Sequence, residues 1–411
     1  MPVEALMVCS WFPFPVTSGN RKRTLRLAEA IERAGATPVL LTVEHPGDEA
    51  LEEVERRGWK AHTASGAGGR GLSRLEQHLR GFPFSESASM AAALRQLAPR
   101  AAFVQLEEER FLQYARFLPA GARSVMSVYN VDSEVIDTST PRGRRYSPSW
   151  WRAAWYVKRM QLTEQRTARK VDAVICVSDQ DRSYFGKQSS NVLLVPNGVD
   201  EELLEVDPSP PEGDEVLFFG QLRYAPNREG LTRLLREVWP IVLANRPTAR
   251  LRIAGPGSDA PGVRALVEGA EGVELIGFVP DLKAELARNR LVVAPLWSGG
   301  GTRLKVLEAL AAARPVVGTP FAVGELGFRD GVHGRVGETA DELAAGIVDL
   351  MGDDDAWRSA AAQGRLLASA ARWTSVTEPA ERLYRRWIEE AAGPGERLPA
   401  AEHGVRPVGS P

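Results

Sequence analysis

The chain has 411 residues, which excludes a single small binding module and predicts two or three domains at about 150 residues each. Hydrophobic residues make up 44% and charged residues 25% of the sequence, so the chain can build folded cores and is not disordered throughout. The 51 basic and 53 acidic side chains nearly cancel, which excludes the broad positive field of a nucleic-acid-binding protein. Any anion must therefore be bound locally.

Two cysteines, Cys9 and Cys176, lie within apolar runs. They are too few for a disulfide framework and poorly placed for a metal site, so we expect buried thiols in a reducing compartment. The N-terminal residues lack the basic segment and long apolar segment of a signal peptide, and no window approaches about 18 uninterrupted apolar residues. These features predict a soluble, cytoplasmic protein.

Short apolar runs alternate with helical patterns along the chain, which is typical of βαβ units and parallel sheets. In the first half the expected strands are 4–10, 37–43, 101–106, 124–129, 172–178 and 191–196, with helices at 22–34 and 150–169. In the second half the expected strands are 215–220, 249–255, 272–278, 290–296 and 314–320, with helices at 228–244, 263–269, 282–288, 302–312 and 340–351.

An acidic, Pro-rich segment separates the two halves and has few apolar residues, so we interpret residues 201–214 as an interdomain linker. The pattern predicts an α/β protein with two facing Rossmann-like domains, residues 1–200 and 215–375. Four large apolar residues near the end recur at helical spacing, which predicts a helix over 376–392 that packs back on the N-terminal domain. They are Leu383, Tyr384, Trp387 and Ile388. The Pro- and Gly-rich residues 393–411 are expected to be a disordered tail.

The most informative segment for function is residues 292–317, VVAPLWSGGGTRLKVLEALAAARPVV. An apolar strand is followed by three glycines and by a helix expected to start near Thr302. Glycines allow close approach of a ligand to the backbone, and the N–H groups of a first helical turn attract anions. Arg303 and Lys305 fall in that turn, where a cation costs roughly 0.3 to 1 kcal/mol. A bound anion such as pyrophosphate would offset this cost.

Glu308 lies one turn deeper on the same helix face, where its carboxylate can accept two hydrogen bonds from a ribose diol. One alternative is a solvated Lys305–Glu308 pair, which would contribute a few tenths of a kcal/mol. The other is a plain glycine turn. Three glycines, two cations and one carboxylate in so short a segment favour the nucleotide site.

This strand, glycine turn and helix resemble the donor-nucleotide motif of retaining GT-B glycosyltransferases, the glycogen-synthase-like group called family 4. The subgroup that reads GGGTRLKVLEA is the most similar. The resemblance implies a nucleotide sugar in an interdomain cleft, with Arg303 and Lys305 as catalytic residues at its phosphates and Glu308 at its ribose. The family's first Glu, which usually lies beside the sugar ring, falls on Gly300, so this sequence departs from the commonest family pattern here. The donor-binding residues that the resemblance implies are Gly19, Arg223, Phe278, Val279, Gly300, Gly301, Thr302 and Glu308.

Other segments also resemble this family. LFFGQLRYAPNREG resembles the first strand and loop of the donor domain, although Gln221 replaces the usual Arg, the usual Lys is absent, and Arg223 would have to compensate. LIGFVPDL resembles the segment that faces the nucleobase, which places Phe278 and Val279 there. LLVPNGVD resembles the start of the interdomain hinge. The alternatives are an exposed loop arginine, core packing at a strand end and an ordinary Asn-Gly turn.

In the N-terminal half, FPFPVTSGNRKRTLRLAEAI places Gly19 in a loop before a helix, like the family's glycine loop at the donor phosphates and acceptor. SVMSVYNVDSEV resembles the family's Asp-X-His-Asn segment, with Tyr129 in place of His. We therefore expect Tyr129 and Asn130 on the acceptor side. Glu164 matches a recurrent family Glu, but we interpret it as a helical surface residue.

Residues 142–159, RGRRYSPSWWRAAWYVKR, interleave cationic and aromatic side chains. This pattern indicates either contact with a membrane surface or lipid acceptor, or an amphipathic helix whose Trp side chains pack on the domain.

Together these observations predict a hexosyltransferase that moves a sugar from a nucleoside-diphosphate sugar to a hydroxyl of a bacterial glycan, glycolipid or secondary metabolite, and the family resemblance implies that it retains the anomeric configuration. It would act in the cytoplasm or peripherally at the inner membrane. The donor is a co-substrate, and we expect no cofactor and no metal, since the Asp triplet at 353–355 falls between two helices. The alternative is a catalytically inactive GT-B-like protein that binds a nucleotide sugar or a partner, which Gln221, Gly300 and Tyr129 favour. A nicotinamide dehydrogenase is disfavoured because no GxGxxG follows the first strand, and an epimerase of the same fold would differ in its product.

Overall fold

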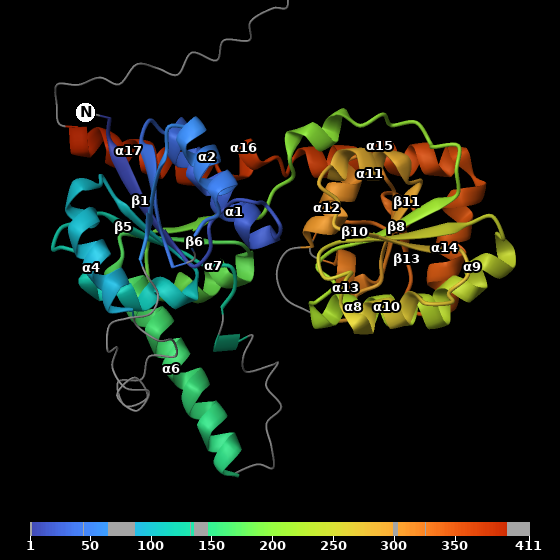
Figure 1. The fold of residues 1–411 in the computed structure, drawn as a ribbon, viewed down its shortest axis with the longest axis horizontal. Coiled ribbons are helices and arrows are strands. Elements are labelled where there is room, and N and C mark those ends of the chain that lie inside the picture. The colour runs from blue at the N-terminus through green and yellow to red at the C-terminus, as the bar shows by residue number, and fades with distance from the viewer. Residues whose placement is uncertain are drawn as a thin grey trace, which may run out of the picture. The chain divides into compact units, whose positions relative to one another are not determined.

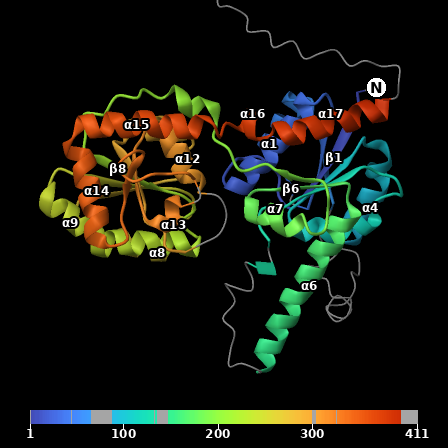
Figure 2. The ribbon, with the colours of Figure 1, turned by 180° about the vertical axis from the view of Figure 1, so that it is seen from behind.

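A computed structural model describes the chain over residues 2–43, 45–64, 87–131, 133–134, 147–298, 303–324 and 326–392. The chain forms two compact units, which we call the N-terminal unit (Met1–Val195 with Thr377–Pro411) and the C-terminal unit (Pro196–Val376). Each unit is an α/β domain with helices on both faces of a parallel sheet (Figures 1 and 2). The expected α/β class with two parallel sheets is confirmed. The expected tail 393–411 lies outside the described residues.

The N-terminal sheet has the strand order β3-β2-β1-β4-β5-β6-β7, and every pair that the structure describes is parallel. Its strands are β1 (Glu4–Cys9), β2 (Thr37–Thr42), β3 (Lys60–Thr63), β4 (Val104–Glu107), β5 (Ser124–Ser127), β6 (Ala173–Cys176) and β7 (Val192–Leu194). Side chains alternate between two buried faces: Ala5 and Met7 belong to one apolar cluster, Leu6 and Val8 to another. Cys9 and Cys176 are both buried free thiols, as expected.

Helices cover both faces of this sheet. One face carries α1 (Gly19–Arg33), α2 (Asp48–Arg56) and α17 (Glu378–Ala392). The other carries α4 (Ala88–Leu97), η1 (Ala98–Arg100), η2 (Glu109–Phe117), α6 (Pro148–Lys170) and α7 (Asp179–Phe185). Figure 1 shows the N-terminal end of α6 projecting away from the sheet.

The C-terminal sheet has the order β10-β9-β8-β11-β12-β13, again with parallel pairs. Its strands are β8 (Glu215–Phe219), β9 (Arg250–Ala254), β10 (Val273–Gly277), β11 (Leu291–Ala294), β12 (Val316–Gly318) and β13 (Gly334–Val336). One face packs on α8 (Ala225–Arg233), the π-turn η4 (Leu234–Val238), α9 (Trp239–Asn245), α10 (Pro261–Val267) and α14 (Ala340–Gly352). The other packs on η3 (Glu201–Glu205), α11 (Leu282–Arg288), α12 (Leu304–Ala311), α13 (Pro320–Val323) and α15 (Asp354–Ser369), which α16 (Trp373–Val376) follows.

The expected linker differs in the structure, because residues 201–214 belong to the C-terminal unit. Leu203 and Val206 are buried in its core, so even two apolar side chains suffice to attach the segment. Arg314 adds hydrogen bonds from its guanidinium to the carbonyls of Asp207 and Ser209.

Several helices also differ from expectation. The helix expected at 228–244 is interrupted by the π-turn η4, next to Pro240, which cannot donate a backbone hydrogen bond. Helices α2, α4 and α7 are not among the helices predicted from the sequence. The Asp triplet at 353–355 begins α15, where Asp353 accepts hydrogen bonds from two backbone N–H groups, both at 2.9 Å. None of the described helices is long and apolar enough to cross a membrane.

Helix α17 closes the core of the N-terminal unit although the whole C-terminal unit precedes it in the chain. Its buried stripe includes Leu383, Tyr384, Trp387 and Ile388, and the Tyr384 ring stacks on Phe103 at 4.9 Å between centroids. Burying each such side chain stabilises the fold by about 1.5–3 kcal/mol. The N-terminal unit therefore needs α17, the last helix that the structure describes.

We predict that Trp387→Ala lowers the free energy of unfolding of the N-terminal unit by about 3–5 kcal/mol, because it leaves a cavity beneath α17. Urea denaturation followed by circular dichroism measures this. The control is the exposed neighbour Arg386→Ala, which should change stability by less than about 0.5 kcal/mol. Equal losses in both variants would contradict the packing role of α17.

Candidate functional site

The C-terminal sheet contains a switch point, by which we mean a place where the chain leaves two neighbouring strands in opposite directions. From β8 the chain continues through α8 to β9 on one side, and from β11 through α12 to β12 on the other. In parallel α/β sheets, ligands bind at the carboxyl ends of the strands at such a point. Arg303, Lys305 and Glu308 all follow β11 here, so the candidate site lies at this edge.

Lys305 reaches over the end of β8. Its Nζ donates a hydrogen bond to Asn227 Oδ1 at 2.8 Å and lies 5.2 Å from the centroid of the Phe218 ring. The backbone of Gly220 has φ +142°, and a Cβ there would lie 3.1 Å from Nζ, so a side chain would crowd the lysine. Asn227 is itself held by a hydrogen bond from Nδ2 to the carbonyl of Gln221 at 2.8 Å.

Burial lowers the pKa of Lys305 to about 8. The Glu308 carboxylate opposes this shift, and the Arg303 guanidinium adds to it. Because the hydrogen-bond acceptor of the lysine is a neutral amide, no direct ion pair within the described residues cancels the ammonium charge. A bound anion would stabilise this charge.

Arg303 and Glu308 flank the lysine on α12. The helix begins at Leu304 rather than near Thr302, because Arg303 is its N-cap, with a non-helical ψ of 62°. The Arg303 guanidinium lies 4.3 Å from the Phe321 ring centroid. Glu308 is 7% exposed, so it is not a solvated surface partner. Gly300, Gly301 and Thr302 lie outside the described residues.

Arg223 is exposed, as expected of a loop arginine, and pairs with Asp259 at 3.3 Å. Its side chain packs on Gly257, whose φ is +89° and where a Cβ would lie 2.6 Å from Arg223 Cγ. An exposed ion pair contributes about 0–1 kcal/mol, so a ligand can displace it at little cost. The pair joins the loops that follow β8 and β9.

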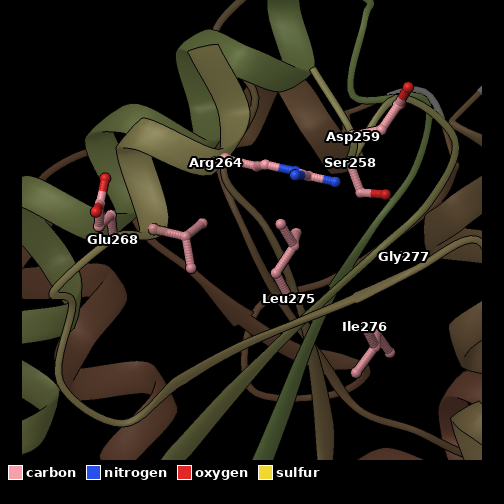
Figure 3. A pocket seen from close by; sticks show the side chains of 8 residues that line it. Ser258, Asp259, Arg264, Glu268, Leu275, Ile276 and Gly277 are labelled. Atoms are coloured by element: carbon pink, nitrogen blue, oxygen red, sulfur yellow. The ribbon is translucent and has the colours of Figure 1, made fainter. Parts of the chain in front are cut away.

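A cavity of about 580 Å³ lies between α10 and the carboxyl end of β10. Figure 3 shows Arg264 extending from α10 toward Ser258, above an apolar floor that includes Leu275. The lining residues are Ser258, Asp259, Arg264, Val267, Glu268, Leu275, Ile276 and Gly277. Directly after this strand come Phe278, which is 50% exposed, and Val279, which is half-buried. The cavity is two strands from β8, on the same sheet edge as Lys305.

The structure places Gly19 at the start of α1 rather than in the preceding loop. Ser18 is the N-cap and accepts a hydrogen bond from the N–H of Arg21 at 3.4 Å, so the helix begins one turn earlier than expected. The Arg21 guanidinium also donates to the carbonyl of Phe12 at 2.5 Å, which ties the preceding loop to the helix.

Tyr129 lies at the carboxyl end of β5 but its hydroxyl points into the domain. The hydroxyl donates to Glu107 Oε2 at 2.8 Å and lies 3.1 Å from Thr24 Oγ1. Asn130, next to it, is half-buried. Glu107 is not among the site residues predicted from the sequence. In the sequence it is only the first of three acidic residues that follow an apolar strand. Its burial raises the pKa of its carboxyl, and the nearby Arg23 opposes that shift.

The interpretation of Glu164 as a surface residue is wrong. Its carboxylate is fully buried and accepts hydrogen bonds from the Ser133 N–H at 3.0 Å, the Ser133 hydroxyl at 2.7 Å and the Tyr184 hydroxyl at 3.0 Å. Helical periodicity alone did not show that this part of α6 faces the sheet. Glu164 therefore anchors the segment after β5.

The aromatic and basic patch begins at 142–146, which lie outside the described residues, and continues on α6. None of the side chains described between Trp150 and Arg159 is fully buried, and Trp151 is 58% exposed. Trp155 stacks with the Arg159 guanidinium at 5.0 Å. Figure 2 shows this end of α6 standing clear of the sheet.

Within the part of the chain that the structure describes, no group of three or more His, Cys, Asp or Glu side chains is arranged to hold a metal ion.

Comparison with known proteins gives matches in both units. Residues 18–203 match the family model described as Glycosyltransferase Family 4, and residues 213–353 match the one described as Glycosyl transferases group 1. A phosphatidyl-myo-inositol mannosyltransferase of Mycobacterium leprae is 30% identical over 242 residues, which are 56% of this chain and 63% of that protein. The chain thus aligns with less than two thirds of the length of the curated relatives it matches.

Solved structures resemble almost the whole chain. Sucrose-phosphate synthase from Thermosynechococcus elongatus has a TM-score of 0.67 at 16% identity, over 95% of this chain and 100% of that one. Anabaena Alr3699/HepE, solved in complex with UDP and glucose, has a TM-score of 0.64 at 14% identity, over 93% and 99% of the two chains. Together with the two parallel α/β sheets, these likenesses show that the fold is GT-B.

We predict that Lys305→Met makes the ligand-free protein more stable at pH 7, by roughly 1 to 3 kcal/mol, because folding desolvates the lysine charge. The lysine is charged in both states below about pH 8, so the full cost applies there. Between about pH 8 and the ordinary lysine pKa of about 10.4, the folded state loses its proton first and the advantage of the variant shrinks. Urea denaturation at several pH values measures this.

The control is Lys283→Met, since a hydrogen bond to Glu205 raises the pKa of that lysine. This variant should not be stabilised. A Lys305→Met protein less stable than the wild type at pH 7 would contradict the buried charge.

Proposed function

We propose that this GT-B protein, both units of which match glycosyltransferase domains, transfers a sugar from a nucleoside diphosphate to a hydroxyl group of an acceptor. The matches support transferase activity. The observation that carries the proposal is Lys305, held by Asn227 at the switch point of the C-terminal sheet. A half-buried ammonium group whose hydrogen-bond partner is neutral is suited to bind a diphosphate.

The difficult step of such a transfer is departure of the nucleoside diphosphate, which gains negative charge as the glycosidic bond breaks. In our proposal Lys305, Arg303 and the N-terminus of α12 stabilise this charge. Protein cations then do the work of a divalent metal, and the donor is a co-substrate rather than a resident cofactor. We further propose retention of the anomeric configuration and a hexose as the transferred sugar, in keeping with the family resemblance.

The remaining donor contacts follow from the positions of side chains along the carboxyl edge. We assign the ribose to Glu308, and the base to Phe278, Val279 and the adjacent cavity, whose apolar floor suits a flat ring. Arg223 is free to contact the donor once its exposed pair with Asp259 opens. Gly300, Gly301 and Thr302 would complete the phosphate site.

On the N-terminal unit we assign Gly19 to the donor phosphates and Tyr129 and Asn130 to the acceptor side. In our proposal Tyr129 forms a wall of the acceptor site and donates no proton there, because its hydroxyl proton is already engaged by Glu107. The same observation favours a second candidate function, a protein that binds a nucleotide sugar without transferring it.

We predict that Arg303→Ala and Lys305→Ala each lower turnover at least about a hundredfold, the loss seen when one preorganised donor group is removed. The measurement is nucleoside diphosphate release from UDP-, GDP- and dTDP-sugars with a hydroxyl acceptor mixture, with and without EDTA. Arg358→Ala, an exposed charge on α15, is the control. Near-normal turnover in the two site variants would overturn the phosphate assignment, and wild-type binding without release would favour the binding protein.

The acceptor and location are proposed from α6 and from one relative. The mycobacterial relative is named a phosphatidyl-myo-inositol mannosyltransferase. We propose that this chain acts in the bacterial cytoplasm or at the inner membrane surface on a glycan, glycolipid or secondary metabolite. Residues 142–159 would contact anionic headgroups through Lys158 and Arg159, with Trp151 at the interface.

We predict that the protein cosediments with vesicles that contain anionic lipid and not with neutral ones. Lys158→Glu should weaken this binding at least about fivefold, since one cation near such a surface contributes about 1 kcal/mol. The charge-matched control is Lys187→Glu at an exposed position outside the patch. Absence of binding to anionic vesicles removes the membrane proposal and leaves the transferase proposal unchanged.

A further inference from the structure

Asn227 and Lys305 come from helices that follow two neighbouring strands, so their contact joins both sides of the switch point. Asn227 lies in the first turn of α8 after β8, and Lys305 lies in the first turn of α12 after β11. Asn227 is 6% exposed and its side chain is hydrogen-bonded at both ends. This arrangement is a built contact rather than a chance meeting of surface groups.

The amide of Asn227 can be oriented in only one way. Its Nδ2 donates to the carbonyl of Gln221 at 2.8 Å, and that carbonyl cannot donate in return. Oδ1 must therefore face Lys305, whose ammonium group has only donors. The asparagine thus fixes the place of the lysine charge without cancelling it.

Two charged groups act on the lysine electrostatically without bonding to it directly, and other charged groups lie on the elements next to it. On its own helix are Arg303 at the N-cap and Glu308 one turn deeper. On the loop after β8, Arg223 pairs with Asp259. On α8, Glu229 accepts a hydrogen bond from the Ser298 hydroxyl at 3.3 Å. From β8 itself the lysine meets an aromatic ring, that of Phe218.

We propose that Asn227 is a positioning residue that holds the Lys305 ammonium group at the donor diphosphate while leaving its charge uncancelled, so that donor binding becomes coupled to protonation of this lysine. This inference rests on the proposed function. A carboxylate at position 227 would hold the lysine equally well but would compete with the diphosphate for it. An apolar side chain would leave the ammonium group buried without an acceptor.

The consequence is a specific pH dependence. Because burial lowers the pKa of Lys305 to about 8, the free protein loses this proton above that pH, and an anion must bind together with a proton. The affinity for a diphosphate should then change little near pH 7 and fall about tenfold for each pH unit above about 8.

The experiment is isothermal titration of the full chain with UDP, GDP and inorganic pyrophosphate between about pH 6 and 9.5, for the wild type, Asn227→Leu and Asn227→Asp. In Asn227→Leu the fall in diphosphate affinity should begin about one pH unit lower, because the charged form of Lys305 loses its hydrogen-bond acceptor. In Asn227→Asp the fall should begin about one unit higher, with affinity at pH 7 at least about tenfold weaker, because the new carboxylate both stabilises the lysine charge and competes for it.

Two controls distinguish a positioning role of Asn227 from a merely structural one. Asn245→Leu makes the same change at an exposed helical position and should leave the wild-type profile unchanged, and Lys305→Met should bind weakly with no fall near pH 8. Thermal melting shows whether each variant is folded. If both Asn227 variants weaken binding by the same factor at every pH, the role of Asn227 is only structural and the positioning role is overturned. If the wild type binds none of the three probes, the proposed function fails as well.

Discussion

The candidate site depends on a half-buried positive charge at the point where the chain leaves the neighbouring strands β8 and β11 in opposite directions. Both faces of the C-terminal sheet are covered by helices, so its carboxyl edge is the part left for a ligand. Lys305 crosses this edge from α12 to Asn227 on α8. The neutral amide holds the lysine while its charge stays available, which is what recognition of a diphosphate requires.

The same arrangement favours anion binding but lowers the stability of the ligand-free protein. Desolvation of Lys305 disfavours its charged form in the ligand-free protein, and a bound anion removes that penalty. Close packing supports the arrangement, because Gly220 leaves room beneath the ammonium group and Phe218 offers an aromatic face. Residues with no role in chemistry thereby decide whether the lysine can occupy its position.

The N-terminal unit is organised around a buried polar network instead. Glu107 accepts the hydrogen bond of Tyr129, and Gln105, beside it in β4, accepts one from Tyr384 on α17. Helix α17 is thus linked, through β4, to Tyr129. Such networks are specific because each buried polar group must find its partner. In this unit Tyr129 and α17 are therefore parts of one buried network.

The sequence alone determined the alternation of strands and helices, the division into two α/β units and the cationic helix start after β11, because these depend on local periodicity and on residues adjacent in the chain. It also marked the apolar stripe of α17. Only the tertiary structure decided that Glu164 is buried, that residues 201–214 join the C-terminal unit, and that the proton of Tyr129 is engaged by Glu107. It alone paired Asn227 with Lys305, which are 78 positions apart. Local pattern carries no information about which distant side chain meets a buried charge, since that depends on the order of strands in the sheet.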